Sequence, residues 1–207
     1  MICVPRGALF EETVDCLSAA GLDVQPLRDI GRRLVADADG VRYITTRPSD
    51  VGTYVEAGAA DVGIVGTDVL REYQPDVDEL LDLRYGGCRM IYATLDGEDP
   101  TSEALTHFGA VRIATKYVNS ARRYFARTGR PVEVVKVNGS VELAPLVGLA
   151  DGIVDLTATG RTMIENGLVE REEIFTSSAR LIANRVSHKT KADRIDALLR
   201  RLSEATP

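Results

Sequence analysis

The chain has 207 residues, 44% of them hydrophobic and 27% charged, which is the composition of a globular protein with a sizeable core. Its net charge of −6 argues against broad binding to nucleic acids or to acidic membranes. Only four of its 25 basic residues are lysines, and an excess of arginine suits bidentate recognition of discrete phosphate groups.

The first half of the chain alternates strand and helix patterns. We expect, in order, a strand at 2–4, a helix at 7–20 closed by Gly21, hairpin strands at 34–36 and 41–44 around Asp39-Gly40, a helix at 50–57, a strand at 60–65, a helix starting after Gly66, and strands at 80–83 and 88–93. Such alternation predicts an α/β fold with a largely parallel sheet.

The second half repeats this alternation. The patterns predict strands at 111–115, 132–137 and 153–156, helices from Asn119 to 128, from 141 to 150 and up to Asn166-Gly167, and a last amphipathic helix at about 189–203 with Ile195, Leu198, Leu199 and Leu202 on one packing face.

The most informative segment follows the strand at 153–156 and reads Thr157-Ala158-Thr159-Gly160-Arg161-Thr162. Small and hydroxylated residues at a strand-to-helix junction expose N–H and O–H donors, and the positive end of the following helix favours a phosphate. Arg161 can fork onto phosphate oxygens, and Asp155 is an acceptor for sugar hydroxyls beside them. The segment suits a phosphorylated ribose, although a plain capped turn has the same composition.

Other candidate residues follow strand ends, where parallel sheets bind ligands. In the second half these are Lys116, a possible phosphate contact, and Glu142, which could bind sugar hydroxyls or act through a bridging metal. In the first half they are Arg6 and Gly7, and Gly66, Thr67 and Asp68. The simplest arrangement for a two-substrate transfer is two such half-sites facing each other across a cleft.

The cysteine and histidine residues argue against two other classes of enzyme. Cys3, Cys16 and Cys88 have no metal-ligand spacing, and His107 and His188 lie far apart without a supporting motif. A zinc enzyme and a Ser-His-Asp hydrolase are therefore not expected. No signal-peptide pattern or transmembrane-length apolar run is found, so we expect a cytoplasmic protein.

Several long segments together resemble ATP phosphoribosyltransferase of histidine biosynthesis. They are residues 47–51, 53–56, 58–66, 114–117, 139–151, 155–162 and 178–185. The resemblance implies two α/β lobes similar to type II periplasmic binding proteins, with a ligand cleft between them. Residues 1–88 and 173–207 would form the first lobe, and residues 89–172 the second.

The resemblance also implies the reaction. Ring nitrogen N1 of ATP attacks C1 of phosphoribosyl pyrophosphate, and pyrophosphate leaves with Mg²⁺ present. The family's 5-phosphoribosyl loop maps onto Asp155 and the segment 157–162. Its pyrophosphate-facing arginine maps onto Arg32, in preference to the adjacent Arg33. Many members read Pro-Lys-Gly-Arg near the start, whereas this chain has Arg6 and then Ala8, so the charge at the last position is lost.

The length resembles that of the short form of the family, which works with a histidyl-tRNA-synthetase-like regulatory subunit. The resemblance therefore implies that partner, and self-association is expected as well. Two alternatives stay open from the residues alone. One is a bilobal small-molecule binding module without catalysis, because a fold does not fix a function. The other is a phosphoribosyltransferase that uses a free base.

Overall fold

The computed structural model describes residues 1–97, 99–103 and 110–206, so that His107 lies outside the described part. The chain divides into two compact units. The first is formed by Met1–Gly87 with Ser178–Pro207, and the second by Cys88–Ser177. Strand β10, at Leu168–Ser177, pairs with β6, at Cys88–Leu95, up to Ser177, so residues 173–177 belong to the second unit.

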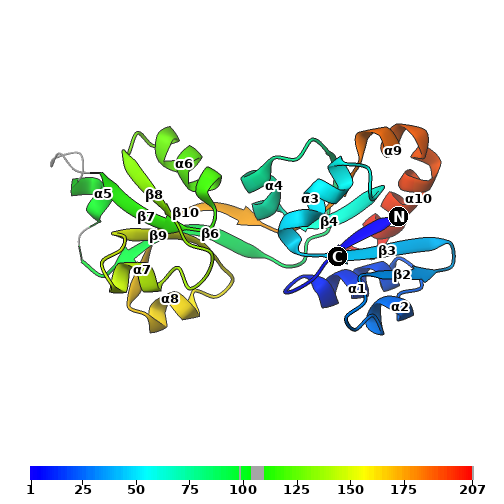
Figure 1. Ribbon diagram of the computed structural model, residues 1–207, viewed down its shortest axis with the longest axis horizontal. Helices are drawn as coiled ribbons and strands as arrows, with labels where there is room; N and C mark the ends of the chain where they lie inside the picture. The colour runs from blue at the N-terminus through cyan, green and yellow to red at the C-terminus, as the bar shows by residue number, and fades with distance from the viewer. Residues whose placement is uncertain (98, 104–109, 207) are drawn as a thin grey trace. The chain divides into compact units, whose positions relative to one another are not determined.

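The first unit contains a six-stranded sheet in the order β2-β3-β1-β4-β11-β5 (Figure 1). Its strands are β1 Ile2–Pro5, β2 Val35–Ala38, β3 Val41–Thr46, β4 Val62–Gly66, β5 Asp78–Asp82 and β11 Ala179–Ala183. Strands β3, β1 and β4 are parallel, while β2, β11 and β5 pair antiparallel with their neighbours. The expected hairpin is confirmed, since Asp39 and Gly40 both have positive φ, as a two-residue turn of this type requires.

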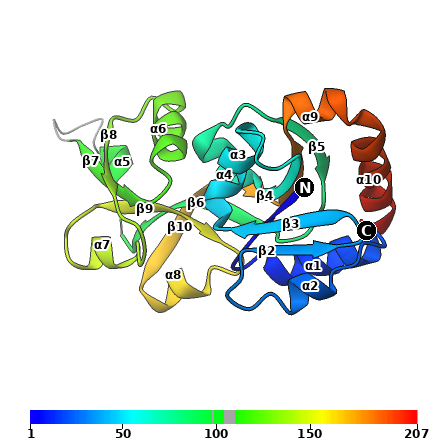
Figure 2. The same cartoon turned by 45° about the vertical axis from the view of Figure 1, so that its right-hand side comes forward.

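Helices cover both faces of this sheet (Figure 2). They are α1 Phe10–Ala19, α2 Gln25–Arg28, α3 Pro48–Glu56, α4 Thr67–Tyr73, α9 Arg185–Thr190 and α10 Ala192–Ala205. Side chains of α1, α2 and α10 pack with Ile2 and Val4 on one face, and those of α3 and α4 pack with Cys3 on the other. This division follows the alternation of side chains along β1.

The second unit contains a five-stranded sheet in the order β10-β6-β9-β7-β8. The strands not yet given are β7 Val111–Thr115, β8 Val132–Lys136 and β9 Gly152–Thr157, and the helices are α5 Pro100–Glu103, α6 Val118–Arg127, α7 Leu143–Leu146 and α8 Arg161–Glu165. Strands β8, β7 and β9 are parallel, and β6 and β10 are antiparallel additions. Helix α6 packs on one face, and α7 and α8 lie with the core of the other.

Three expectations are corrected. The sheets are mixed rather than largely parallel, because β2 and β11 in the first unit and β6 in the second pair antiparallel with the parallel strands. Strands β10 and β11 were not revealed by the sequence patterns. The helix expected at 141–150 is only the four-residue α7, which is followed by Gly148 at φ 71, a conformation that ends helices. The last helix is interrupted at Lys191, and the cap of α9 is Asn184, whose side chain accepts from the N–H groups of Val186 and Ser187.

The apolar face of α10 is a packing surface, as expected. Ile195 and Leu202 are buried in the core of the first unit, and Leu198 and Leu199 pack against it. Within the described residues, none of the helices is long and apolar enough to cross a membrane.

Candidate active site

The parallel strands bring the predicted loops together at one edge of each sheet. In the second unit, Thr115 pairs with Lys136, and Ala114 pairs with Ile153, so the carboxyl ends of β7, β8 and β9 point the same way. The loops that follow these strands carry Lys116, Glu142 and residues 157–162. In the first unit, the carboxyl ends of β1 and β4 carry residues 6–7 and 66–68 in the same manner.

The segment 157–162 forms a tight turn that leads into α8. Gly160 precedes the helix at φ 74, and its N–H donates to Thr157 Oγ1 at 2.7 Å. The N–H of Arg161 donates to Thr159 Oγ1 at 3.4 Å. The two hydroxyls therefore shape the loop from within. The side chain of Thr162 is exposed, and its hydroxyl has no hydrogen-bond partner within the described residues.

Arg161 and Ala158 are also exposed on this loop. The Arg161 Nε lies 2.7 Å from Glu165 Oε1 in an exposed pair one helical turn apart. Such a pair contributes at most a few tenths of a kcal/mol, so the guanidinium can exchange it for a phosphate at little cost.

Asp155 is the most unusual side chain of this edge. Its Oδ1 is buried and has no hydrogen-bond partner, the only such atom found in the described part of the chain. Burial raises the pKa of the carboxyl, and Glu142 adds to that effect, while the Leu156 N–H and the charge of Lys116 oppose it. Two of the other predicted residues, Lys116 and Glu142, thus lie close enough to act on the carboxyl of Asp155.

Burial disfavours the charged form of a carboxyl, so ionised Asp155 should destabilise the free protein. Because its folded pKa is raised, the penalty is fully present above that pKa and disappears below the unfolded value of about 3.9. We expect Asp155→Asn to raise the free energy of unfolding at pH 7 by about 1 kcal/mol. Denaturant titration should show this gain at pH 7 and lose it near pH 3; an equal gain at both pH values would contradict it.

Arg32 lies in the loop between α2 and β2 of the first unit. Its side chain is exposed and makes no hydrogen bond or ion pair to any residue the structure describes. The adjacent Arg33 is engaged, because its Nη2 donates to the carbonyl of Asp29 at 2.8 Å and its Nε to that of Ile30 at 3.4 Å. Of the two arginines, Arg32 is the one with its charge available to a ligand.

The remaining residues of the first unit differ in their availability. Gly7 is exposed at φ 95, and a Cβ there would meet nothing within 4 Å. Gly66 caps α4, and Asp68 is half-buried in the first turn of that helix. The Thr67 hydroxyl donates to the Ser178 carbonyl at 3.0 Å and accepts from Arg180 Nε at 3.1 Å. Thr67 therefore ties α4 to β11 as well as lying at the predicted edge.

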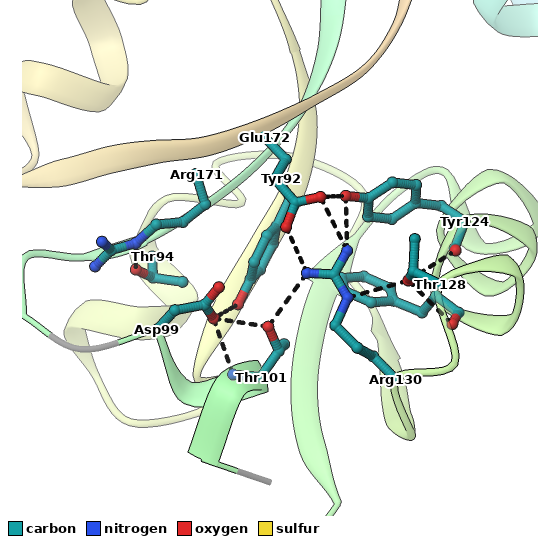
Figure 3. Close-up of polar contacts among 10 residues, drawn as sticks. Tyr92, Thr94, Asp99, Thr101, Tyr124, Thr128, Arg130, Arg171 and Glu172 are labelled. Atoms are coloured by element: carbon teal, nitrogen blue, oxygen red, sulfur yellow. Dashed lines mark hydrogen bonds and ion pairs between the residues drawn. The ribbon is translucent and has the colours of Figure 1, made fainter. Parts of the chain in front are cut away.

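Sequence reasoning missed a polar network in the second unit (Figure 3). Arg130 donates from Nη1 and Nη2 to the two carboxylate oxygens of Glu172, at 2.6 and 3.0 Å. The Tyr124 hydroxyl donates to the same carboxylate, and Tyr92 donates to Asp99 at 2.7 Å. Arg130 and Glu172 are far apart in the sequence, so no local sequence pattern predicts their contact.

The position of the network separates it from the predicted loops. Arg130 precedes β8, whereas the segment 157–162 follows β9, which runs parallel to β7 and β8 through the same sheet. The network therefore braces the opposite edge of the sheet. Its guanidinium also lies 5.1 Å from the ring centroids of Tyr124 and Phe125, which makes it a packed structural element.

The two mixed α/β units define the class of two-lobe proteins to which periplasmic binding proteins belong. The chain is similar to the sulphonate-binding protein SsuA from Escherichia coli, with a TM-score of 0.58 at 11% identity, over 99% of this chain and 71% of the other. At that identity the likeness concerns the fold alone. The helix-capping loop at 157–162 and the exposed Arg32 add groups suited to phosphates.

The particular family follows from closer matches. The model of the family "HisG: ATP phosphoribosyltransferase" matches residues 47–204. An ATP phosphoribosyltransferase from Rubrobacter xylanophilus is 53% identical over 96% of this chain and 92% of its own length. One from Symbiobacterium thermophilum is 48% identical over 98% and 93%. The structure of the ATP phosphoribosyl transferase (HisG:HisZ) complex from Thermotoga maritima matches with a TM-score of 0.83 at 32% identity, over 99% of this chain and 96% of that chain.

The chain belongs to the ATP phosphoribosyltransferase family. The resemblance noted from the sequence is confirmed, and so are the two-lobe α/β fold and the enzyme class, a glycosyltransferase that joins a phosphoribosyl group to ATP in histidine biosynthesis. The alternative of a binding module without catalysis is not supported.

Proposed function

We propose that the chain carries out this transfer by direct displacement at C1 of phosphoribosyl pyrophosphate. Adenine N1 of ATP forms a bond to C1, and the bond from C1 to the pyrophosphate oxygen breaks with its electron pair. The observation that carries the proposal is the buried, unpartnered carboxylate oxygen of Asp155 beside a loop of exposed hydroxyl and guanidinium groups.

The phosphoribosyl half of the site is assigned to the second unit. The segment 157–162 binds the sugar 5-phosphate through the exposed Thr162 hydroxyl, the guanidinium of Arg161 and N–H groups at the start of α8. Asp155 accepts from a ribose hydroxyl, which gives its Oδ1 the partner it lacks. The charge of Glu142 acts on the carboxyl of Asp155, and we assign Glu142 to the remaining sugar hydroxyls.

The leaving group is assigned to Arg32. A developing oxocarbenium-like sugar and a departing pyrophosphate need alignment and charge stabilisation more than a strong base. An exposed guanidinium without an internal partner supplies this at little cost. Gly7, Gly66, Thr67, Asp68 and Lys116 are the candidate contacts of the nucleotide, whereas the Arg6 guanidinium is engaged within the first unit, where it binds the Gly31 carbonyl.

Magnesium fits this donor set as a substrate-bound ion. Within the described residues, no group of three His, Cys, Asp or Glu side chains could hold a metal by itself. Mg²⁺ commonly binds one or two carboxylates together with substrate phosphates, and Asp155 and Glu142 are the carboxylates at this edge. When bound, the ion would neutralise charge on the departing pyrophosphate.

The direct test is product formation. Purified chain mixed with ATP, phosphoribosyl pyrophosphate and Mg²⁺ should form phosphoribosyl-ATP, detected by mass spectrometry. Free adenine in place of ATP should give no product. Product formation from adenine would instead indicate an enzyme that uses a free base. If no phosphoribosyl-ATP forms even in the presence of a regulatory subunit, or if adenine reacts equally well, the proposed function fails.

A regulatory partner is the second part of the proposal. The solved relative from Thermotoga maritima is a HisG:HisZ complex, and this chain covers 96% of the matched chain. We assign to the present chain a histidyl-tRNA-synthetase-like partner in a hetero-oligomer, self-association within that assembly, and a cytoplasmic location suited to a biosynthetic enzyme.

We expect histidine to inhibit weakly or not at all when this chain is alone, and to inhibit once the partner is added. The physical reason is that an effector acts through its different affinities for two states of the complex. Calorimetric titration of the isolated chain and of the complex measures both cases. Tight histidine binding to the isolated chain would contradict this division of roles.

A further inference from the structure

The side chain of Arg6 is engaged in holding another loop. Its Nε donates to Thr45 Oγ1 at 3.0 Å, its Nη1 to the carbonyl of Gly31 at 3.0 Å, and its Nη2 to the carbonyl of Arg33. Thr45 is 4% exposed, at the end of β3 beside β1. Three of the five N–H groups of the guanidinium are therefore bound within the first unit.

The two carbonyls that Arg6 holds belong to the residues immediately before and after Arg32. The next carbonyl, that of Leu34, accepts from the Thr45 N–H at 2.8 Å. The loop is thus fastened on both sides of Arg32, while the Arg32 side chain itself is exposed and unpartnered within the described residues. A planar fork with fixed donor directions suits this task, and a lysine ammonium does not reproduce it.

The other hydrogen bonds of the loop hold it from the side of α2. Gly31 has φ 54, and Gly residues lose more conformational freedom on ordering than any other type. Arg33 binds the end of α2 through its side chain, and its N–H donates to the Ile30 carbonyl at 3.0 Å, so α2 holds one side of the Arg32 peptide. Arg6 is the side chain that connects this peptide to the central strand β1.

We propose that Arg6 is a positioning residue for Arg32, which it aligns by binding the carbonyls on either side of it. This role rests on the proposed function, in which Arg32 acts on the pyrophosphate leaving group. Arg6 then affects the chemical step through Arg32, rather than by contributing a phosphate contact of its own.

The test is a double-mutant cycle on the chain with its regulatory partner. Arg6→Met, Arg6→Lys, Arg32→Ala and Arg6→Met/Arg32→Ala are compared by single-turnover rate and by the dissociation constant of ATP. The matched control is Arg42→Met, because Arg42 lies on β3, the strand that carries Thr45, and among the described residues its side chain pairs with Asp37 alone. Hydrogen exchange of the N–H groups of residues 31–35 reports the order of the loop without reference to activity.

We expect Arg6→Met to lower the single-turnover rate by roughly 10- to 100-fold, as a displaced catalytic group does, with ATP affinity unchanged. Arg6→Lys should lose nearly as much, and Arg6→Met should cost nothing further when Arg32 is already alanine. Exchange in the loop should accelerate about tenfold in both Arg6 variants, and Arg42→Met should match the wild type.

A full Arg6→Met penalty in the Arg32→Ala background, weaker ATP binding, or retained activity in Arg6→Lys would overturn the proposal in favour of a direct ligand contact. Unchanged exchange at 31–35 would overturn the positioning itself. Failure of the proposed function has a different signature: Arg32→Ala would then leave the rate unaltered, whatever Arg6 does to the loop.

Discussion

Arg32→Ala should lower the rate of phosphoribosyl transfer by about 10²–10³-fold, the usual loss when one charge-stabilising group of a transition state is removed. Pyrophosphate gains charge as the bond to C1 breaks, so the guanidinium contributes most in the transition state. The affinity for ATP should change far less. Single-turnover kinetics measures the first quantity and equilibrium titration the second.

Arg33→Ala provides the matched control. It removes the same charge one residue away, but from a side chain that binds the carbonyls of Asp29 and Ile30. We expect a loss of stability, seen as a lower melting temperature, without a comparable loss in the chemical step. If Arg32→Ala left single-turnover rates intact while ATP binding collapsed, Arg32 would be a nucleotide-binding residue instead.

Changes in the segment 157–162 should act on the other substrate. Thr162→Val removes an exposed hydroxyl that we assign to the 5-phosphate, and a charge-assisted hydrogen bond contributes about 1.5–3 kcal/mol. The affinity for phosphoribosyl pyrophosphate should fall by roughly 10- to 150-fold. Gly160→Val should weaken it as well, because the new side chain crowds the approach of the phosphate and is strained at φ 74.

The control for backbone strain is Gly167→Val at the other end of α8. Gly167 has φ 70, and a Cβ there would meet nothing within 4 Å, so the two valine variants carry similar strain. Only Gly160→Val should lose phosphoribosyl pyrophosphate affinity, measured by calorimetry. Unchanged affinity in both Gly160→Val and Thr162→Val would remove the 5-phosphate from this loop.

Asp155 should have opposed effects on the stability of the free protein and on the binding of substrate. Its unpartnered Oδ1 and its raised pKa indicate that Asp155 lowers the stability of the free protein. A ribose hydroxyl that donates to Oδ1 would supply the missing hydrogen bond. Glu142 and Lys116 act on the same carboxyl with opposite signs, so the charge of this edge depends on which substrate groups are bound. A strained or unsatisfied group in a binding region is retained when ligand binding satisfies it.

Local patterns were sufficient for most of the secondary structure. The strand at 153–156 and the helix-starting glycine that follows it are visible because apolar runs and turn residues act over a few positions. The hairpin at Asp39-Gly40 is equally local. The segment 141–150 was misjudged because its apolar residues suggest a longer helix, while Ser140 at φ 46 and Gly148 at φ 71 confine α7.

What the sequence determined by itself was therefore the α/β class, the family, and the loops that carry the candidate ligands, since each depends on contiguous residues. The tertiary structure decided how those residues are used. It brought β10 and β11 back as antiparallel strands, engaged Arg33 and Thr67 internally, and left Arg32 exposed. Arg6 reaches carbonyls 25 and 27 positions away, and the fit of a guanidinium to such groups exists only once the chain has folded.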